Sequence, residues 1–141
     1  MKNIIFTLLI SVISFSIQAQ EKTEVTLPLS SSLKVGDLLF ISGQIGIHPK
    51  TSQLSNSSFE EESKQVMENL KNELKKHNLT MEDLVSTTIY LKDMKQYDEL
   101  NKVYSNYFMN TFPTRTCIAI QELPAKASVE ISAIAHFKNN K

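Results

Sequence analysis

The sequence predicts one α+β domain in which a sheet of about five or six strands carries two helices on one face. Short apolar stretches typical of strands lie near both ends of the chain, and two segments with helical periodicity lie between them. About 120 residues follow the first apolar segment, enough for one compact domain and too few for two. Two helices cannot cover both faces of such a sheet, so we expect one face to remain open.

Residues 1–19 are typical of a secretory signal peptide. Lys2 precedes an uncharged run from Ile4 to Ile17, and Ala19 is the small residue expected before a cleavage site. The run is shorter than the ~20 residues that a membrane span needs. We therefore expect export to the periplasm or the medium, no membrane segment in the mature form, and a single mature domain of residues 20–141.

The first part of this domain reads as two strands. Alternating apolar residues predict a strand over Glu24–Ser32, and Lys34–Asp37 has the composition of a turn. The apolar run Leu38–Ile41 is typical of a buried strand. Gly43 interrupts the apolar pattern that follows. A glycine inside a strand usually marks a bulge or the close approach of another group, here a ligand among the candidates.

Two amphipathic segments predict the helices. Ser58–Glu61 resembles a capping box ahead of the first helix, and Asn78 is a suitable end for it. A strand over Val85–Leu91 precedes a second helix from about Lys95 to Met109. The tyrosines of the second helix have the spacing of a core stripe rather than a stacking platform. The apolar stripes comprise Phe59, Val66, Met67, Leu70 and Leu74 in the first helix and Tyr97, Leu100, Tyr104, Tyr107 and Phe108 in the second.

The last two predicted strands, over 114–122 and 128–137, each have two different faces. In the second strand one face is wholly apolar, and we expect it to lie under the helices together with the threonine and isoleucine face of the first. The opposite faces combine Arg115 and Cys117 with Glu130. That mixture is too apolar for open water and too polar for a dry core. We expect it to meet another copy of the chain, with Arg115 and Glu130 near the subunit boundary.

Arg115 is the only arginine in the 141 residues, and every other fixed positive charge is a lysine. A single guanidinium after the apolar Phe112-Pro113 corner suggests a site that needs a planar, bidentate donor. The alternative is an arginine paired with a nearby carboxylate at the start of a strand. Spacing does not decide between the two.

The overall composition argues against several classes of function. The 15 basic and 15 acidic residues balance, so no basic footprint for nucleic acid is present. The three histidines show no ligand spacing, which argues against a metal site. Cys117 is the only cysteine, so the fold cannot rest on an internal disulfide.

Several motifs together resemble the RidA/YjgF family of enamine and imine deaminases, also described as endoribonuclease L-PSP-like. The resemblance spans about Pro28 to Phe137, and its motifs are specific in combination. The segments that carry it are Phe112–Cys117, Leu123-Pro124, Val129–Ile131, Ser42–Ile45 and His48–Thr51.

The resemblance implies a chorismate-mutase-like fold assembled as a homotrimer, with sites in the clefts between subunits. It implies that Arg115 holds a substrate carboxylate, and that Glu130, with the backbone around Cys117, positions a water molecule. Ser42, Gly43 and Asn101 match positions that line the family's pocket. The implied reaction is hydrolysis of a 2-imino acid, in equilibrium with its enamine, to a 2-keto acid and ammonia. No metal or organic cofactor is implied.

The sequence also departs from the family pattern. Leu29 stands where many of these deaminases carry a tyrosine that closes over the ligand, which would leave the pocket more apolar. An alternative is therefore a non-catalytic trimer that binds small carboxylates or partner proteins. Ribonuclease activity is a third hypothesis, and the absence of a basic patch argues against it.

Two questions about individual side chains remain open in the sequence. The pKa of Glu130 is raised if desolvation dominates and lowered if an ion pair with Arg115 dominates. We assign the Cys117 side chain to packing rather than nucleophilic catalysis, because no histidine lies near it in sequence.

Overall fold

A computed structural model describes residues 28–138 of the chain. The predicted signal peptide lies outside these residues. Within them, five strands and two α-helices follow the predicted order, joined in places by short 3-10 turns. Their bounds are β1 Ser32–Val35, β2 Leu38–Ile45, α1 Phe59–Lys76, β3 Leu84–Leu91, α2 Tyr97–Ser105, β4 Thr114–Ala119 and β5 Val129–His136.

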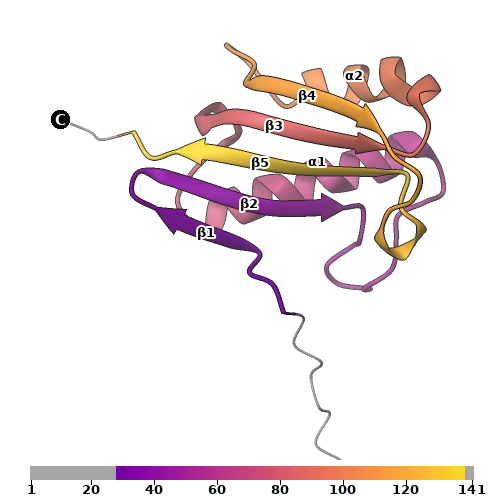
Figure 1. Cartoon of the computed structure of the whole chain (residues 1–141), viewed down its shortest axis with the longest axis horizontal. Helices are drawn as coiled ribbons and strands as arrows, with labels where there is room; N and C mark the ends of the chain where they lie inside the picture. Colours follow the sequence, from indigo (N-terminus) through magenta and orange to yellow (C-terminus); the bar gives the residue numbers. More distant parts are fainter. Residues whose placement is uncertain (1–27, 139–141) are drawn as a thin grey trace, which may run out of the picture.

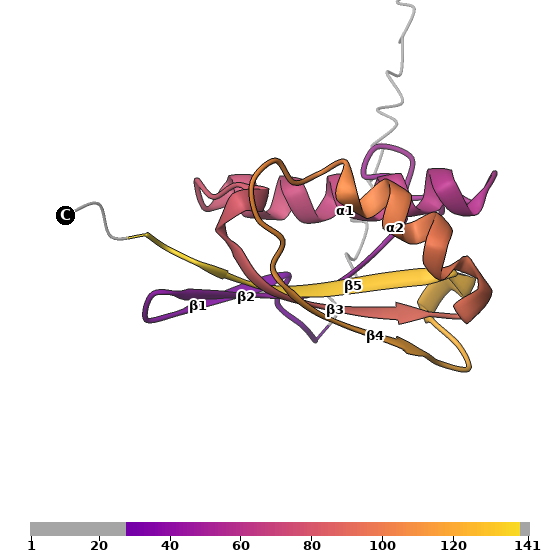
Figure 2. The same ribbon diagram turned by 90° about the horizontal axis from the view of Figure 1, so that it is seen from above.

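The strands form one mixed sheet in the order β1-β2-β5-β3-β4 (Figure 1). Neighbouring strands are antiparallel except β3 and β4, which are parallel and are connected through α2. A parallel pair needs such a crossover connection, whereas β1 and β2 need only a tight hairpin. Both helices lie on the same side of the sheet, and the other side is left uncovered by the described chain (Figure 2). The predicted α+β architecture is confirmed.

Helix α1 has the ends that its sequence predicts. Ser58 is extended (φ −153°, ψ 164°), and its hydroxyl accepts a hydrogen bond from the Glu61 amide at 3.1 Å. Acidic residues occupy the first turn and lysines the last, as the helix dipole favours. The residue at the end, Asn78, has φ 59°, a left-handed conformation that asparagine tolerates better than most residues.

Helix α2 is shorter than predicted. It covers Tyr97–Ser105 instead of reaching Met109, and the turn before it is capped by Asp93, which accepts from the Lys95 amide at 2.9 Å. Tyr107 lies beyond the helix end, where its hydroxyl donates to the Lys64 carbonyl of α1 at 3.3 Å. The aromatic residues at the end of the pattern thus pack against the core from a turn, which periodicity alone cannot distinguish from a helix.

The first strand was predicted too early in the chain. Residues 28–31 form no strand, and β1 contains Lys34 and Val35, which were predicted to turn. The hairpin instead turns over Gly36 and Asp37, with Gly36 at φ 59°. Glycine reaches this left-handed region without a steric penalty, so two residues are enough to reverse the chain.

The hydrophobic core fills the space between the sheet and the helices. Its side chains come from every strand except β1 and β4 and from both helices. The sheet residues that contribute are those on the face toward α1 and α2. The largest fully buried apolar side chains are Leu39, Val66, Met67, Leu70, Leu74, Ile89, Leu91, Leu100, Val129 and Ile131.

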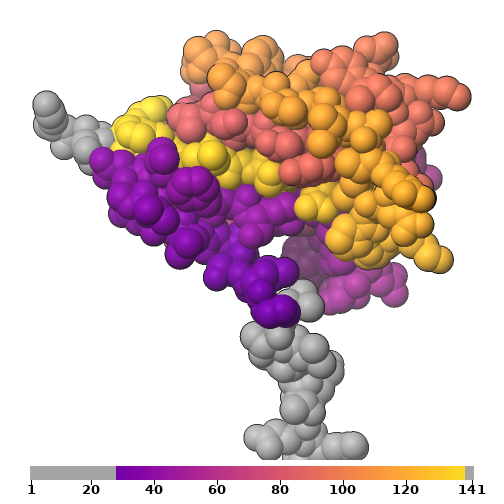
Figure 3. Space-filling model, in the orientation of Figure 1, coloured from indigo at the N-terminus to yellow at the C-terminus, as the bar shows by residue number. Residues whose placement is uncertain are grey.

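The open face of the sheet exposes several large apolar side chains, and Figure 3 views the molecule from this side. Leu33 is 59% exposed, Phe40 42% and Ile118 43%. Leu33 and Phe40 are register partners on β1 and β2, so they lie side by side. A surface of this kind is unusual on an isolated soluble domain and is typical of an interaction site. Neither described helix is long and apolar enough to cross a membrane.

A buried carboxylate ties the start of β1 to α1. The Ser31 and Ser32 hydroxyls donate to Glu73 Oε1 at 2.9 and 2.7 Å, and Lys76 Nζ lies 2.6 Å from Glu73 Oε2. The Ser32 hydroxyl also lies 2.8 Å from His77 Nε2. Burial raises the pKa of Glu73, but these donors outweigh it and the net pKa is lowered. The charged form is therefore the one that the fold stabilises.

Replacing Glu73 with alanine is expected to lower the free energy of unfolding by about 1–3 kcal/mol, because its three donors lose their shared acceptor. Urea denaturation at pH 7 measures the loss. The exposed Lys75, in the same turn of α1, gives a control, since Lys75→Ala should change stability by less than about 0.5 kcal/mol.

The same variant has an expected pH dependence. Because the folded-state pKa of Glu73 is depressed, its contribution is present above the ordinary value of 4.5 and is lost as the pH falls. The stability gap between wild type and Glu73→Ala should therefore narrow on acidification. A gap that widens toward low pH would contradict this account.

Candidate functional site

Arg115 and Glu130 lie on opposite faces of the sheet. In the parallel pair, Arg115 is the register partner of Thr87, a buried residue on the face that the helices cover. Glu130 is the register partner of Tyr90 on the open face. The prediction that Arg115 and Cys117 share the open face with Glu130 is therefore wrong.

The reason for this error is physical. Alternation along a strand shows which residues share a face but not which face points inward, and that depends on the register with the neighbouring strand. On β4 the more apolar set, which includes Ile118, lies on the open face, while Arg115 and Cys117 lie beneath α2. Aromatic side chains of α2 make this position suitable for a guanidinium.

The Arg115 guanidinium is half-buried between two aromatic rings. Its Cζ atom lies 5.4 Å from the centroid of the Tyr97 ring and 5.1 Å from that of Tyr104, and its Nη2 donates to the Tyr97 hydroxyl at 2.9 Å. Within residues 28–138, no carboxylate lies within 4.0 Å of it. The hypothesis of a structural ion pair is thus not supported in this part of the chain, and the positive charge remains available to a ligand.

A cavity of ≈ 360 Å³ lies beside this guanidinium. The Asn101 side chain contributes a buried Oδ1 that accepts no hydrogen bond in the structure. Buried acceptors are rarely left unpaired in native proteins, so this oxygen indicates a missing donor. The cavity therefore places a cation suited to a carboxylate beside a residue whose buried acceptor is unpaired. Its lining comprises Asn101, Tyr104, Ser105, Phe112, Pro113 and Arg115.

Helix α2 supplies half of the residues that line this cavity, and Tyr97 of the same helix contacts Arg115. Tyr97, Asn101 and Tyr104 are spaced i, i+4 and i+7, which places them in one row along the helix. The Tyr104 hydroxyl is fixed by a 3.0 Å hydrogen bond with Thr87, and burial raises its pKa although Thr87 and the Arg115 charge lower it. The predicted core stripe is confirmed, since Tyr104 is buried in the core and Tyr97 packs against it, but that prediction does not include their contact with Arg115. The polar Asn101 in the same row was the signal available in the sequence.

Glu130 lies next to Gly43 on the other side of the sheet. The register of β2 with β5 shifts between Ile41 and Gln44, so the predicted irregularity at Gly43 is present. A Cβ atom on Gly43 would overlap the Glu130 carboxylate, so the glycine also allows the close approach. In the single chain, desolvation raises the pKa of Glu130. Of the two alternatives that the sequence leaves open, desolvation therefore dominates over an ion pair with Arg115. An open cavity of ≈ 400 Å³ here is lined by Gly43, Tyr90, Ile120, Leu123, Glu130 and Ser132.

Leu29 belongs to the segment that leads into β1, and Ser42 of β2 holds this segment in place. The Ser42 hydroxyl donates to the Ser30 carbonyl at 2.7 Å, and its amide donates to the Ser31 carbonyl at 3.0 Å. Ser42 therefore holds the chain next to Leu29, whose side chain is 63% exposed. Neither residue lines the Arg115 cavity or the Glu130 cavity.

Cys117 has the environment of a packing residue. It is half-buried and contacts the hydrophobic core. Burial raises the pKa of its thiol, and the nearby Arg115 charge only partly opposes this. A thiol with a raised pKa is a poor nucleophile at neutral pH, which supports the assignment of the side chain to packing.

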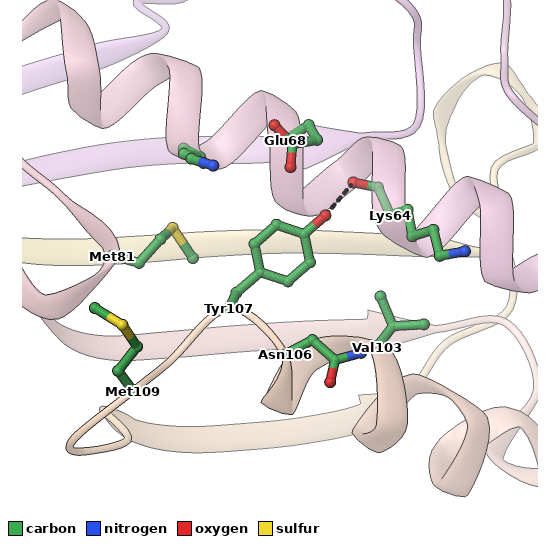
Figure 4. Close-up of a pocket in the computed structure, with 8 residues that line it drawn as sticks. Lys64, Glu68, Met81, Val103, Asn106, Tyr107 and Met109 are labelled. Carbon is green, nitrogen blue, oxygen red and sulfur yellow. Dashed lines mark hydrogen bonds between the residues drawn. The ribbon is translucent and has the colours of Figure 1, made fainter.

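A third cavity, of ≈ 470 Å³, lies between α1 and the segment after α2 (Figure 4). Tyr107 crosses it to reach the Lys64 carbonyl, and burial together with Glu68 raises the pKa of Tyr107 to about 12. The Lys64 ammonium already pairs with Glu60 at 2.7 Å. This cavity contains none of the predicted site residues. Among residues 28–138 no cluster of histidine, cysteine and acidic side chains is suited to a metal ion.

Comparisons with known proteins identify the family of this chain. The family model Endoribonuclease L-PSP matches residues 20–137. A RutC family protein of Saccharolobus solfataricus is 40% identical over 108 residues, which cover 77% of this chain and 86% of that protein. The 2-iminobutanoate/2-iminopropanoate deaminase of mouse is 36% identical over 108 residues, covering 77% and 80%.

A solved structure shows the same fold. The crystal structure of a putative endoribonuclease from Thermotoga maritima superposes with a TM-score of 0.78 at 36% identity, covering 82% of this chain and 91% of that chain. The chain belongs to the Endoribonuclease L-PSP family, the RidA/YjgF group of proteins.

Proposed function

We propose that this protein is an exported imine deaminase that hydrolyses 2-imino acids to 2-keto acids and ammonia. The observation that carries the proposal is the Arg115 cavity, whose guanidinium has no counter-charge within residues 28–138 and whose lining includes Asn101, with its unpaired Oδ1. A 2-imino acid offers the two complementary groups, a carboxylate and an N–H. Export is proposed from the pattern of residues 1–19.

The complete site requires two copies of the chain. Arg115 lies under α2 and Glu130 lies on the open face, so within one copy the sheet separates them. The apolar open face supports association, and the family resemblance implies a homotrimer with clefts between subunits. We therefore propose that Arg115 and Asn101 of one copy meet Glu130 and Gly43 of its neighbour.

The chemistry follows from these groups. Arg115 binds the carboxylate as a charge-assisted pair, and Asn101 Oδ1 accepts the imine N–H, which orients the C=N carbon. Glu130 holds a water molecule and accepts a proton as the water oxygen bonds to that carbon. The nitrogen takes up protons, the C–N bond breaks to release ammonia, and the remaining hydroxyl becomes the keto oxygen. A carboxyl group with a raised pKa is suited to this exchange near neutral pH.

Turnover should depend on Arg115. With 2-imino acids generated in situ by an amino-acid oxidase, the protein should accelerate keto-acid release above the spontaneous rate. Arg115→Ala should lower kcat/KM by about 100-fold or more, because it removes a charge-assisted anchor. If 2-keto acids bind but neither small nor large apolar imines are hydrolysed faster, the protein is a carboxylate-binding member of the family instead.

A refolding experiment with two variants tests whether each site is shared between two copies of the chain. Arg115→Ala and Glu130→Gln should each have very low activity, and refolding them together at equal amounts should restore about a quarter of the wild-type rate through mixed sites. The variants refolded separately and then mixed form the control. Mixed oligomers without any recovered activity would show that each site draws both residues from one copy.

At a pH where Glu130 is ionised, we expect this residue to lower the stability of the fold. Its folded-state pKa is raised above the ordinary 4.5, so the unfolded chain loses this proton first as the pH rises, and the fold is penalised above that range. Glu130→Gln should therefore raise Tm by a small amount, of the order of 1–3 °C, at pH 7.5. The gain should vanish near pH 3, where both states are protonated. A Tm that falls at pH 7.5 would contradict a net penalty for the ionised form of Glu130 in the folded protein.

Gly43→Ala should displace the Glu130 carboxylate. The φ of Gly43 is compatible with alanine, and the overlapping atoms belong to the flexible end of a side chain, so stability should change by less than about 1 kcal/mol. Turnover should fall by about 10- to 100-fold, because the carboxylate is moved from its position.

Gly46→Ala is the matched control, because it crowds a different glutamate. Its Cβ would lie 2.7 Å from Glu62 Cγ and 3.0 Å from the Glu62 carbonyl oxygen in α1, so it should reduce stability more. Turnover of the folded Gly46→Ala protein should remain within about threefold of wild type. If both variants lose turnover in proportion to stability, Gly43 has no specific role at Glu130.

A further inference from the structure

Within residues 28–138, the Arg115 guanidinium forms a hydrogen bond with Tyr97 and with no other residue. Nη2 of Arg115 donates to the Tyr97 oxygen at 2.9 Å. A guanidinium has five N–H donors in a planar fork, so one of them is committed and the others are free for a ligand. A phenol oxygen carries no formal charge. It therefore fixes the fork without cancelling the positive charge, which a carboxylate in its place would do.

Tyr97 is itself held in position. It is the first residue of α2 and follows the turn Met94–Gln96, whose start is capped by the Asp93 carboxylate. Its ring is partly buried and packs against the hydrophobic core. A tyrosine has only two side-chain torsions, so a packed ring leaves its hydroxyl little freedom.

The two rings beside Arg115 restrict the guanidinium in a second way. The Tyr97 centroid lies 5.4 Å and the Tyr104 centroid 5.1 Å from Cζ, both within the range of cation–π attraction. The Tyr104 hydroxyl is already engaged with Thr87 at 3.0 Å, so it is not the group that fixes an N–H of Arg115. The directional contact comes from Tyr97 alone among the described residues.

We propose that Tyr97 is a positioning residue for Arg115, whose hydroxyl and ring hold the guanidinium so that its remaining N–H groups face the cavity beside Asn101. The inference rests on the proposed function in one respect, namely that Arg115 binds a ligand carboxylate. In this proposal the three residues in one row of α2, Tyr97, Asn101 and Tyr104, have different roles. Tyr97 orients the cation, Asn101 offers the acceptor, and Tyr104 forms a wall.

Tyr97→Phe tests the proposal because it keeps the ring and removes only the hydroxyl. Arg115 is the only arginine of the chain, so its guanidinium gives a single Nε–Hε resonance in NMR spectra of the whole protein. In the wild type we expect hindered rotation of the Nη groups at low temperature, and in Tyr97→Phe we expect rotation to become faster. This readout needs no ligand and no turnover.

Ligand binding gives the second readout. The affinity for 2-oxobutanoate, measured by calorimetry, should fall about 3- to 10-fold in Tyr97→Phe, as for the loss of one hydrogen bond. For imine hydrolysis, KM should rise by a similar factor while kcat changes less than about twofold, because anchoring is lost equally in the ground and transition states. Unchanged guanidinium rotation together with unchanged affinity would overturn the proposal.

Two further variants separate positioning from a general structural effect. Tyr107→Phe also removes a tyrosine hydroxyl, one bonded to the Lys64 carbonyl, and should leave both readouts unchanged. In an Arg115→Lys background, Tyr97→Phe should have little additional effect on affinity, because an ammonium has no planar fork to orient. A full additional loss in that background would show that Tyr97 acts on the ligand directly and not through Arg115.

The outcomes also distinguish this inference from the proposed function. If 2-oxobutanoate binds through Arg115 but no imine is hydrolysed faster, the deaminase proposal fails. The affinity of Tyr97→Phe for 2-oxobutanoate then still tests whether Tyr97 positions Arg115. If 2-oxobutanoate does not bind to the wild type, the rotation of the Arg115 guanidinium alone decides whether Tyr97 positions it. If hydrolysis is rapid and Tyr97→Phe behaves as wild type, only the positioning role is rejected.

Discussion

The covering of one sheet face by two helices is the constraint on which the rest of this structure depends. Because α1 and α2 both pack on the same side, the core forms there and the other side keeps exposed apolar residues. The sheet itself then separates the two chemically interesting side chains. Arg115 lies under α2, where aromatic rings surround it, and Glu130 lies on the open side, beside a glycine that makes room for its carboxylate.

The surroundings of Arg115 and of Glu130 differ in how the fold makes each side chain reactive. At Arg115 the chain provides a charge that is partly removed from water and is given no opposite charge within the described residues. At Glu130 it provides a carboxyl group whose proton is retained because the ionised form loses solvation. Each arrangement costs stability when the chain is considered alone. Such costs are common at functional sites, where the missing partner is a ligand or another subunit.

Much of the fold could be predicted from the sequence because it depends on local patterns. The cap at Ser58, the stop at Asn78 and the alternation of β5 each reflect a few adjacent residues, and all agree with the structure. The end of α2 and the position of β1 could not be predicted in this way. Apolar residues such as Tyr107 and Val35 fit a turn as well as a helix or a strand. Their placement is decided by what they contact, such as the Lys64 carbonyl at the end of Tyr107.

The sequence offers candidate residues for the site, but their arrangement could not be predicted from it. The motifs around Arg115 and Glu130 identified the residues, yet the faces of β4 depend on the register with β3, which no single strand reveals. Tyr97 was missed because its spacing is equally that of a core residue. Only the position of its hydroxyl, 2.9 Å from Nη2 of Arg115, distinguishes the two.

The opposite placement of Arg115 and Glu130 bears on the proposed export of this protein. A chain on its own holds both residues but cannot direct them at one small molecule, since the sheet lies between them. Specific activity would then decline with dilution once the concentration approaches the dissociation constant of the assembly. An exported copy in a large outer volume would need far tighter subunit association than one confined to a crowded compartment. The apolar residues of the open face are where that difference would be encoded.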